Sequence, residues 1–200
     1  MRKVFFALLG VLCLSAQPMS AQNTSVEVLA GMNLSSMSSL DSKIGFHAGV
    51  RIGKDLPSVF NGAYINGAAL LSLKGAEKDY GDLLDVNFNA YYLEIPVHFG
   101  YKYVFNENVA VFGEFGPYFS FGLFGKASVA SMGDKAKVDT FSDEGGVNRF
   151  DFGLGFRLGV ELSNRVPISV GYDFGLVNVA KEVDEAVRNS NLTLSIGYKF

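Results

Sequence analysis

Cysteine is almost absent from this 200-residue chain, which contains one, Cys13. It lies in an N-terminal apolar stretch at residues 4–14, so the rest of the chain has no disulfide framework and no thiol nucleophile. Long apolar runs are missing too, because none beyond that stretch reaches the ~18 residues that a transmembrane helix needs. These absences exclude a disulfide-stapled domain, a thiol enzyme and a helical membrane protein.

Basic residues are also in short supply. The full chain has a net charge of −3, and removal of Arg2 and Lys3 takes it to −5. A mildly acidic chain lacks the basic surface that nucleic-acid binding requires. Hydrophobic residues nevertheless make up 48% of the sequence, and glycine occurs 23 times. A chain this apolar, without a membrane helix, can hide its apolar surface in lipid as a closed β-barrel.

The N-terminus has the order of a secretory signal peptide, with two basic residues, a short apolar stretch and then small residues. We predict cleavage after Ala21, which gives a signal peptide at residues 1–21 and an outer-membrane β-barrel domain at residues 22–200. A lipoprotein signal at Cys13 is the alternative, but Leu12 is bulky for the position before a lipidated cysteine.

Residues 149–162 carry the clearest structural pattern. Every second position is large and apolar, and the positions between are glycine or charged. Because side chains alternate between the two faces of a strand, one face is apolar and the other holds charges and gaps. Lipid outside and a crowded polar interior explain both faces. The apolar positions are Phe150, Phe152, Leu154, Phe156, Leu158, Val160 and Leu162.

Similar alternation recurs along the chain and predicts an all-β fold, an eight-stranded antiparallel up-and-down transmembrane β-barrel in the cell outer membrane. Short links alternate with long polar ones, as is typical of outer-membrane barrels with short periplasmic turns. Eight strands place both termini in the periplasm. The predicted strands are residues 26–34, 44–54, 62–74, 90–103, 109–124, 149–162, 166–177 and 191–200. The predicted long loops are residues 35–43, 75–88, 125–148 and 178–190.

Aromatic residues mark the predicted membrane boundaries. Tryptophan is absent, so tyrosine and phenylalanine must form any aromatic girdle. Tyr91 is expected at the external rim, and Tyr101, Tyr103 and Tyr198 at the periplasmic rim. The outward residues Tyr198 and Phe200 end the last strand in the pattern that the barrel-assembly machinery recognises. We therefore expect these two residues to form the assembly signal and that machinery to be a partner during insertion.

Three motifs carry a family resemblance: Tyr92-Leu-Glu-Ile-Pro96, Gly116-Pro-Tyr-Phe-Ser120 and Val170-Gly-Tyr-Asp-Phe-Gly175. Together with the C-terminal strand, they resemble the PorT-like family of small outer-membrane β-barrels. The likeness covers nearly all of the chain after the signal peptide, and Leu-Glu-Ile-Pro is its most specific part. The resemblance implies an eight-stranded outer-membrane barrel, but no single function and no catalytic residues.

Charged residues share the predicted inner face. An eight-stranded barrel is about wide enough to be filled by its own side chains, and an unpaired charge buried there is costly. We therefore interpret the inner charges as a structural network of ion pairs, with Arg157 close to Asp173 on the next strand. A narrow, gated path for ions is the alternative. The predicted network comprises Arg51, Glu94, Lys102, Glu114, Asp151, Arg157, Glu161, Asp173 and Lys199, with Glu27 on the same face.

Both histidines, His47 and His98, are in phase with the interior. A metal site would need them close together with a carboxylate such as Glu94, but a further strand separates theirs. We therefore predict no metal and no cofactor. A lipid-modifying enzyme would need serine, histidine and a carboxylate together at the outer-leaflet level, and the sequence offers no such cluster. We predict no catalytic residues.

These observations favour a non-enzymatic outer-membrane barrel that stabilises the envelope or presents its loops to a partner, because rigid scaffolds display variable loops well. A narrow pore for ions or small solutes through the charged lumen is the alternative, and a lipid-modifying enzyme is a weaker third hypothesis. The expected partners are outer-membrane lipid and an unidentified loop-binding molecule, and not nucleic acid.

Overall fold

The computed structural model describes residues 23–37, 41–79, 85–131, 134–142, 147–179 and 187–200. Among these residues, no helix has the length and hydropathy needed to cross a membrane. All the regular elements are strands: β1 (Thr24–Met37), β2 (Asp41–Asp55), β3 (Ala63–Asp79), β4 (Asp85–Asn106), β5 (Val109–Ser131), β6 (Asp134–Asp139), β7 (Phe150–Leu162), β8 (Val166–Gly175) and β9 (Asn189–Lys199).

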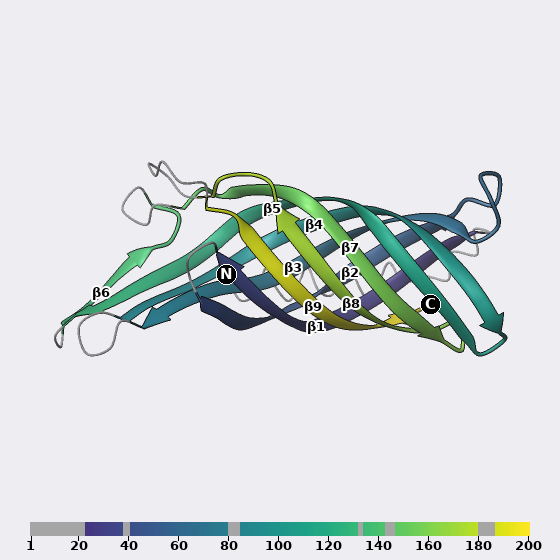
Figure 1. Cartoon of the computed structure of the whole chain (residues 1–200), viewed down its shortest axis with the longest axis horizontal. Coiled ribbons are helices and arrows are strands. Elements are labelled where there is room, and N and C mark those ends of the chain that lie inside the picture. The colour runs from purple at the N-terminus through teal and green to yellow at the C-terminus, as the bar shows by residue number, and fades with distance from the viewer. Residues whose placement is uncertain (1–22, 38–40, 80–84, 132–133, 143–146, 180–186) are drawn as a thin grey trace, which may run out of the picture.

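Eight of these strands close into a barrel (Figure 1), which confirms the predicted fold. The order around the ring is β4-β3-β2-β1-β9-β8-β7-β5, and pairing of β4 with β5 closes it. Every pairing is antiparallel, so the strands run up and down. The ninth strand, β6, pairs only with the distal part of β5 and lies outside the ring. Closure leaves no open edge in the ring for lipid to meet.

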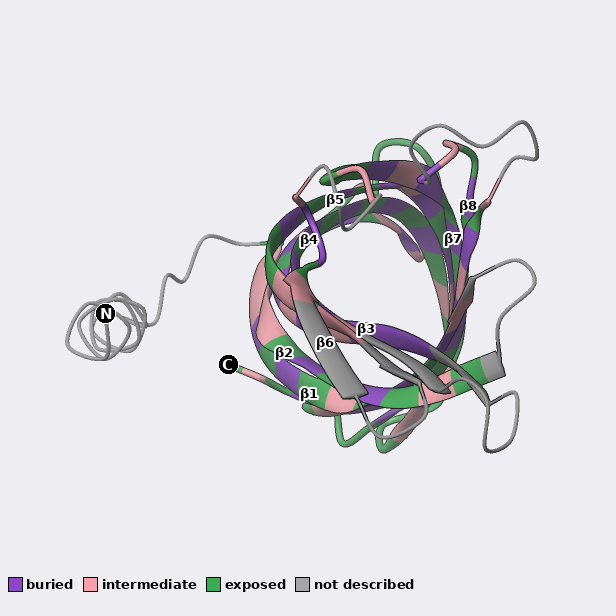
Figure 2. Ribbon diagram, turned by 90° about the vertical axis from the view of Figure 1, so that its left-hand side faces the viewer, coloured by how far each residue is buried: buried purple, intermediate pink, exposed green. Residues whose placement is uncertain are grey.

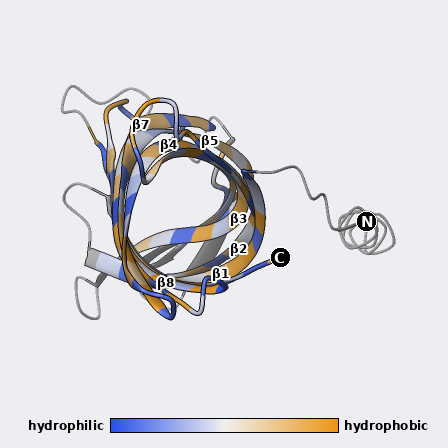
Figure 3. Ribbon diagram, turned by 90° about the vertical axis from the view of Figure 1, so that its right-hand side faces the viewer, coloured by the Kyte–Doolittle hydropathy of each residue, from blue (hydrophilic) through white to orange (hydrophobic). Residues whose placement is uncertain are grey.

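The side-chain alternation read from the sequence has the predicted direction. In β7, Asp151, Gly153 and Arg157 are buried inside, while Phe156 and Leu158 are exposed on the outer face. Buried and exposed positions alternate along the strands in Figure 2, and hydrophilic and hydrophobic positions do so in Figure 3. The apolar side chains therefore face lipid and the polar ones face the lumen.

Most strands extend further than the sequence predicts, and β3, β4 and β5 extend furthest. The ends of β1 and β2 also enter the expected loop at residues 35–43, whose bounds were wrong. The expected loops at residues 75–88 and 125–148 include the distal ends of β3, β4 and β5 and the whole of β6, so those boundaries were wrong. With 22 residues, β4 is about 75 Å long at ~3.4 Å per residue, well beyond what a membrane crossing needs. A strand that extends beyond the lipid no longer needs an apolar face. Its sequence then lacks the alternation that predicts a membrane strand and resembles that of a polar loop.

Tight turns lie at the opposite end of the barrel, together with both ends of the described chain. Ser163 and Asn164 have positive φ angles of 51° and 56°, as a two-residue type I′ hairpin turn requires. The Asn106 side chain accepts hydrogen bonds of 2.9 Å from the backbone N–H groups of Asn108 and Val109. Short turns mark the periplasmic end of such barrels, and the extended strands are therefore external.

Inward glycines make room for large side chains on neighbouring strands. A Cβ added to Gly153 would lie 2.6 Å from the Tyr118 ring, and one added to Gly159 would lie 2.4 Å from the Phe112 ring. Each glycine is the direct cross-strand partner of the residue whose ring covers it. The glycines of residues 149–162 are thus required by the crowding of a narrow lumen. The same relation holds for Gly31 with His47 and for Gly100 with Tyr64.

Candidate functional site: a charged lumen closed at both ends

Glu114 of β5 is buried in the lumen and is bound by side chains from three other strands. Tyr64 donates a hydrogen bond of 2.7 Å to its Oε1, and the Arg157 guanidinium binds its Oε2. His98 Nδ1 lies 3.7 Å from the same Oε2. The Arg157 guanidinium also lies over the Phe112 ring, 5.7 Å from its centroid. The buried carboxylate therefore has the partners that a charge in the lumen requires.

The predicted pairing of Arg157 with Asp173 was wrong. Arg157 is directly opposite Glu114 on β5 and opposite Gly171 on β8, so its guanidinium reaches the carboxylate across the β5–β7 pair. Asp173 instead accepts a hydrogen bond of 3.1 Å from Asn191 Nδ2 on β9. The short turn does bring β7 and β8 together. The register, however, places a carboxylate directly opposite Arg157 on β5 and a glycine opposite it on β8.

Two further ion-pair sets lie toward the periplasmic end. Arg51 Nη1 donates a hydrogen bond of 2.8 Å to Glu27 Oε1, and both residues are buried. Glu161 binds two ammonium groups, that of Lys102 at 3.2 Å and that of Lys199. The two lysine side chains are 26% and 22% exposed, whereas that of Glu161 is 2% exposed. The periplasmic mouth is therefore closed by charges that meet water.

Lys74 of β3 lies toward the external end of the lumen and was not among the charges predicted for the network. The alternation within residues 62–74 nevertheless places it on the inner face. Its ammonium lies 2.5 Å from Glu94 Oε2, and Ser120 donates a hydrogen bond of 3.3 Å to the same oxygen. The ammonium also lies 5.7 Å from the centroid of the Tyr92 ring and 5.2 Å from that of Tyr118. A buried cation is thus held by one carboxylate and two aromatic faces.

Asp151 occupies the same external part of the lumen. Tyr118 donates a hydrogen bond of 3.3 Å to Asp151 Oδ2, and Asn189 Nδ2 donates one of 2.9 Å to it. The nine charges predicted for the network therefore fall into separate groups along the lumen. Asn189 and Asn191, which bind the two aspartates, were not predicted, because the predicted network comprises charged residues alone.

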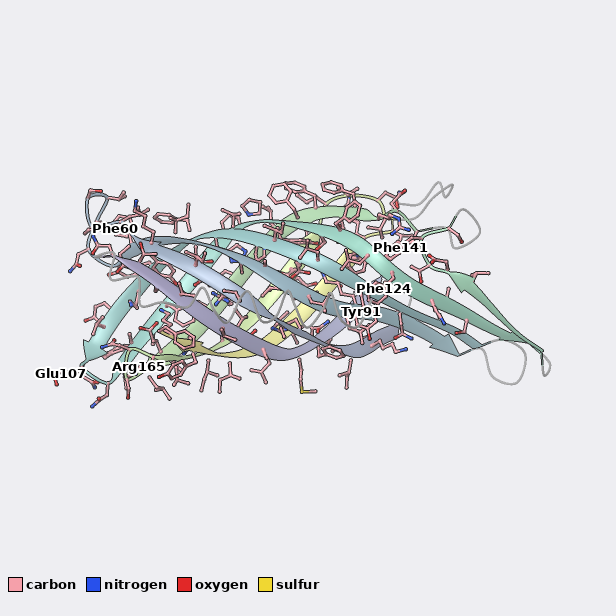
Figure 4. All side chains as sticks on the ribbon, turned by 180° about the vertical axis from the view of Figure 1, so that it is seen from behind. Phe60, Tyr91, Glu107, Phe124, Phe141 and Arg165 are labelled. Atoms are coloured by element: carbon pink, nitrogen blue, oxygen red, sulfur yellow. The ribbon has the colours of Figure 1, made fainter. Side chains whose placement is uncertain are left out.

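A small hydrophobic core caps the external end. Tyr92 is fully buried, and its ring meets that of Phe141 edge to face at 5.7 Å, with Ala76 and Ala90 beside them. Phe141 belongs to the segment after β6 and covers Gly122, whose added Cβ would lie 2.2 Å from the Phe141 ring. Figure 4 shows Phe141 toward the same end of the barrel as Phe124 and Tyr91. No periodic pattern predicts this cap, since Phe141 lies in a predicted loop.

Little space remains between the side chains. One cavity of about 30 Å³ lies at the periplasmic side and another of about 40 Å³ in the middle of the lumen. At roughly 10–15 Å³ per water, each holds two to four water molecules. Arg51 and Arg157 line both cavities, so these two side chains lie between them; we call the pair the arginine partition. Each of these two cavities has room for isolated waters but not for a solute.

The two histidines occupy different places in the lumen. His47 Nε2 lies 2.9 Å from Ser195 Oγ, while His98 faces Glu114. His47 Nδ1 has no hydrogen-bond partner among the described residues, so no carboxylate completes a Ser-His-Asp arrangement there. The described part of the chain also contains no group of three or more His, Cys, Asp or Glu side chains placed to hold a metal ion.

The lipid-facing surface carries aromatic groups at both ends. On the external side, Tyr91 contacts Phe124 with ring centroids 4.7 Å apart and Phe46 at 6.4 Å. On the periplasmic side, Tyr198 and Phe200 contact each other at 5.2 Å and both are exposed. These pairs lie where amphipathic rings are favoured at the boundary between lipid and water.

The family model described as "outer membrane protein beta-barrel domain" matches residues 16–181. This chain belongs to that family. As a member of it with a closed barrel of eight strands, the protein is an outer-membrane β-barrel protein and is located in the outer membrane. No curated protein sequence matches it significantly.

Several solved structures resemble this outer-membrane barrel. They include the attachment invasion locus protein Ail of Yersinia pestis in complex with the heparin analogue sucrose octasulfate (18% identity, 90% of this chain and 100% of that chain, TM-score 0.46). Neisserial surface protein A is 20% identical, with 88% and 97% covered and a TM-score of 0.49. OprG of Pseudomonas aeruginosa is 12% identical, with 89% and 96% covered and a TM-score of 0.45. At these values, nothing about function carries over.

Proposed function

We propose that this protein is a non-enzymatic, non-conducting barrel that serves as a structural scaffold of the outer membrane. The observation that carries the proposal is the filled lumen. Its two cavities have volumes of about 30 and 40 Å³, and the Arg51 and Arg157 side chains separate them. Phe141 and Tyr92 cover the external end. A barrel of eight strands filled in this way has no continuous water path.

The external strands supply a place for a partner. β3, β4 and β5 continue beyond the length needed to cross the membrane, and β6 adds a fourth strand to this projecting sheet (Figure 1). A rigid sheet held by a closed barrel can present connecting segments to molecules outside the cell. The scaffold role therefore includes presentation of these segments to a partner still to be found.

A narrow pore is the second candidate, and one observation favours it. The two cavities follow each other along the lumen and are lined by charged residues, including Arg51, Glu94 and Arg157. Conduction would require both the arginine partition and Phe141 to move. Because these residues would then lose their buried partners, opening the lumen would break several ion pairs and a hydrophobic contact, which is energetically unfavourable.

Single-channel recording in planar bilayers distinguishes the two candidates. The refolded barrel, checked by heat-modifiable gel mobility, should give no reproducible conductance steps. Stable single channels of uniform size would overturn the scaffold proposal and favour the pore. A matched variant, Phe141→Ala, keeps the arginine partition and should also remain silent.

An enzymatic role has little support in the site. His47 and Ser195 are both buried in the lumen, beside a cavity of about 40 Å³ that is too small for a lipid substrate. Incubation of the purified protein with lipid A, followed by mass spectrometry of the acyl chains, should show no change. A changed acyl pattern would contradict both the scaffold and the pore.

The finer family assignment is part of this proposal. The segment Tyr92-Leu-Glu-Ile-Pro96 supports membership of the PorT-like group, and it contributes Tyr92 to the cap and Glu94 to the ion pairs. We also propose removal of residues 1–21 during export. N-terminal sequencing of the protein from outer membranes should begin at Gln22.

The C-terminal strand is proposed as the signal for the barrel-assembly machinery. Phe200 is 69% exposed on the lipid side and its backbone N–H donates to Val26 O. Deletion of Phe200 should reduce the folded fraction in outer membranes and leave unfolded chain in the periplasm. The matched control Phe60→Ala removes another exposed periplasmic phenylalanine and should insert normally. Equal insertion of the Phe200 deletion would contradict this role.

A further inference from the structure

A larger cavity lies among the described residues at the periplasmic rim, outside the filled lumen. Its volume is about 360 Å³, within the range of about 300–1,000 Å³ that is typical of ligand sites. We call it the rim pocket. Its lining includes Asp55, Gly62, Tyr101, Lys102, Tyr103 and Val104.

The rim pocket exists because two neighbouring strands end at different heights. Ala63, the first residue of β3, pairs with Tyr101, while β4 continues to Asn106. The turn at residues 56–62 runs beside this projecting end and is anchored where Lys102 N–H donates a hydrogen bond of 2.8 Å to Gly62 O. Gly62 has a φ of +90°, and a Cβ there would lie 2.4 Å from Lys102 O. Glycine therefore fixes the wall of the pocket.

One side of the rim pocket continues into the lipid-facing surface. The Phe60 ring of the turn meets Phe99 at 6.0 Å and Tyr101 at 5.7 Å, and these rings are exposed on the outer face. Tyr103 and Val104 are also exposed, at 52% and 54%. Figure 4 shows Phe60 at the same end as Glu107 and Arg165, which belong to the short turns. The pocket thus lies at the boundary between the periplasmic leaflet and water.

The pocket also holds one charge of each sign. Lys102 shares the carboxylate of Glu161 with Lys199, so two ammonium groups face one carboxylate and a positive charge is left over. Asp55 contributes an exposed carboxylate to the lining. A ligand that fits this pocket therefore carries both an anion and a cation, next to an apolar part that lies along Tyr101, Tyr103 and Val104.

We propose that the rim pocket binds the headgroup of a zwitterionic phospholipid of the periplasmic leaflet, with phosphatidylethanolamine as the matching chemistry. Lys102 receives the phosphate, Asp55 receives the ammonium group, and the acyl chains follow the exposed rings into the membrane. Charge-assisted contacts of this kind are the strong ones among polar interactions. The site is independent of whether the lumen conducts.

Native mass spectrometry of the folded barrel in maltoside micelles, with added dioctanoyl phosphatidylethanolamine, tests this site. The wild-type barrel should retain one lipid saturably. Asp55→Asn and Lys102→Met should each weaken retention about tenfold, as loss of one charge-assisted contact predicts. Lys54→Met on β2 is the control: it removes a lysine charge, as Lys102→Met does, but at a residue that does not line the rim pocket. This variant should retain the lipid like the wild type.

Other outcomes would overturn the proposal. Equal retention of dioctanoyl phosphatidylglycerol, which lacks the ammonium group, would contradict a zwitterionic site. Competition by soluble phosphoethanolamine at the same concentration as the lipid would show that the apolar wall contributes nothing and that the ligand is not a lipid. Absence of saturable retention, or equal retention by Asp55→Asn and the wild type, would show that no site exists. Heat-modifiable gel mobility shows that each variant is folded.

Discussion

The two ends of the lumen are closed by different chemistry. At the external end, Tyr92 and Phe141 form a small hydrophobic core, and both side chains are buried. At the periplasmic end, Glu161 holds Lys102 and Lys199, whose ammonium groups remain partly exposed to water. One end is covered by a segment that folds over the barrel, and the other is narrowed by side chains of the barrel strands themselves.

This difference shows how each closure contributes to stability. Burying an aromatic ring removes apolar surface from water and is favourable in itself. An ion pair at the water-exposed periplasmic mouth contributes little to stability, because water already solvates the charges. Between the two ends, Glu114 and Arg157 are buried, and there the loss of one partner is costly. The predicted effects of substitution therefore fall from the middle to the external cap and then to the periplasmic mouth.

The largest effect is expected for Arg157→Ala. It leaves the buried Glu114 carboxylate without its cation and should lower the free energy of unfolding by about 3–5 kcal/mol. The double variant Arg157→Ala/Glu114→Ala should recover part of that loss, whereas Arg157→Ala/Asp173→Ala should not. Urea titrations followed by heat-modifiable gel mobility give these values. A larger coupling of Arg157 with Asp173 than with Glu114 would contradict the observed pairing.

Phe141→Ala should come next and act on the cap. Loss of a buried phenylalanine costs about 3 kcal/mol, and here the loss falls on the segment that covers the barrel rather than on the ring of strands. Hydrogen exchange should accelerate at residues 139–142 and 147–149, while the urea midpoint changes less than for Arg157→Ala. Phe124→Ala, at an exposed external phenylalanine, is the control and should leave that exchange unchanged. Unchanged exchange in Phe141→Ala would show that the cap does not depend on this ring.

The smallest effect is expected at the periplasmic mouth. Lys199→Met leaves Glu161 bound to Lys102 and should cost less than about 1 kcal/mol, because the lysine is partly exposed. Replacing both lysines leaves Glu161, which is 2% exposed, without a cation. The double variant should therefore lose more free energy of unfolding than the two single variants together. Additive losses in the same urea titration would show that Glu161 does not depend on either lysine.

The same contrast explains what could be predicted from the sequence. Alternation along a strand is local, so residues 149–162 alone indicate that Arg157 faces inward and Phe156 outward. The partner of Arg157 depends on register across β5 and β7, which distant residues determine, and the assignment to Asp173 failed for that reason. Phe141 follows a strand outside the membrane, where no apolar face marks the fold. Its role depends on the glycine at position 122, which is visible only in three dimensions.

The most direct test of a lumen closed at both ends is the accessibility of engineered cysteines. Removal of residues 1–21 would leave a chain without cysteine, so single substitutions can be read without background. Ser195→Cys lies between the two closures, and Ser25→Cys lines the periplasmic cavity near the mouth. In the folded barrel in lipid vesicles, a small charged thiosulfonate reagent should modify Ser25→Cys and leave Ser195→Cys unmodified from either side. Modification of both at similar rates would contradict the closed lumen.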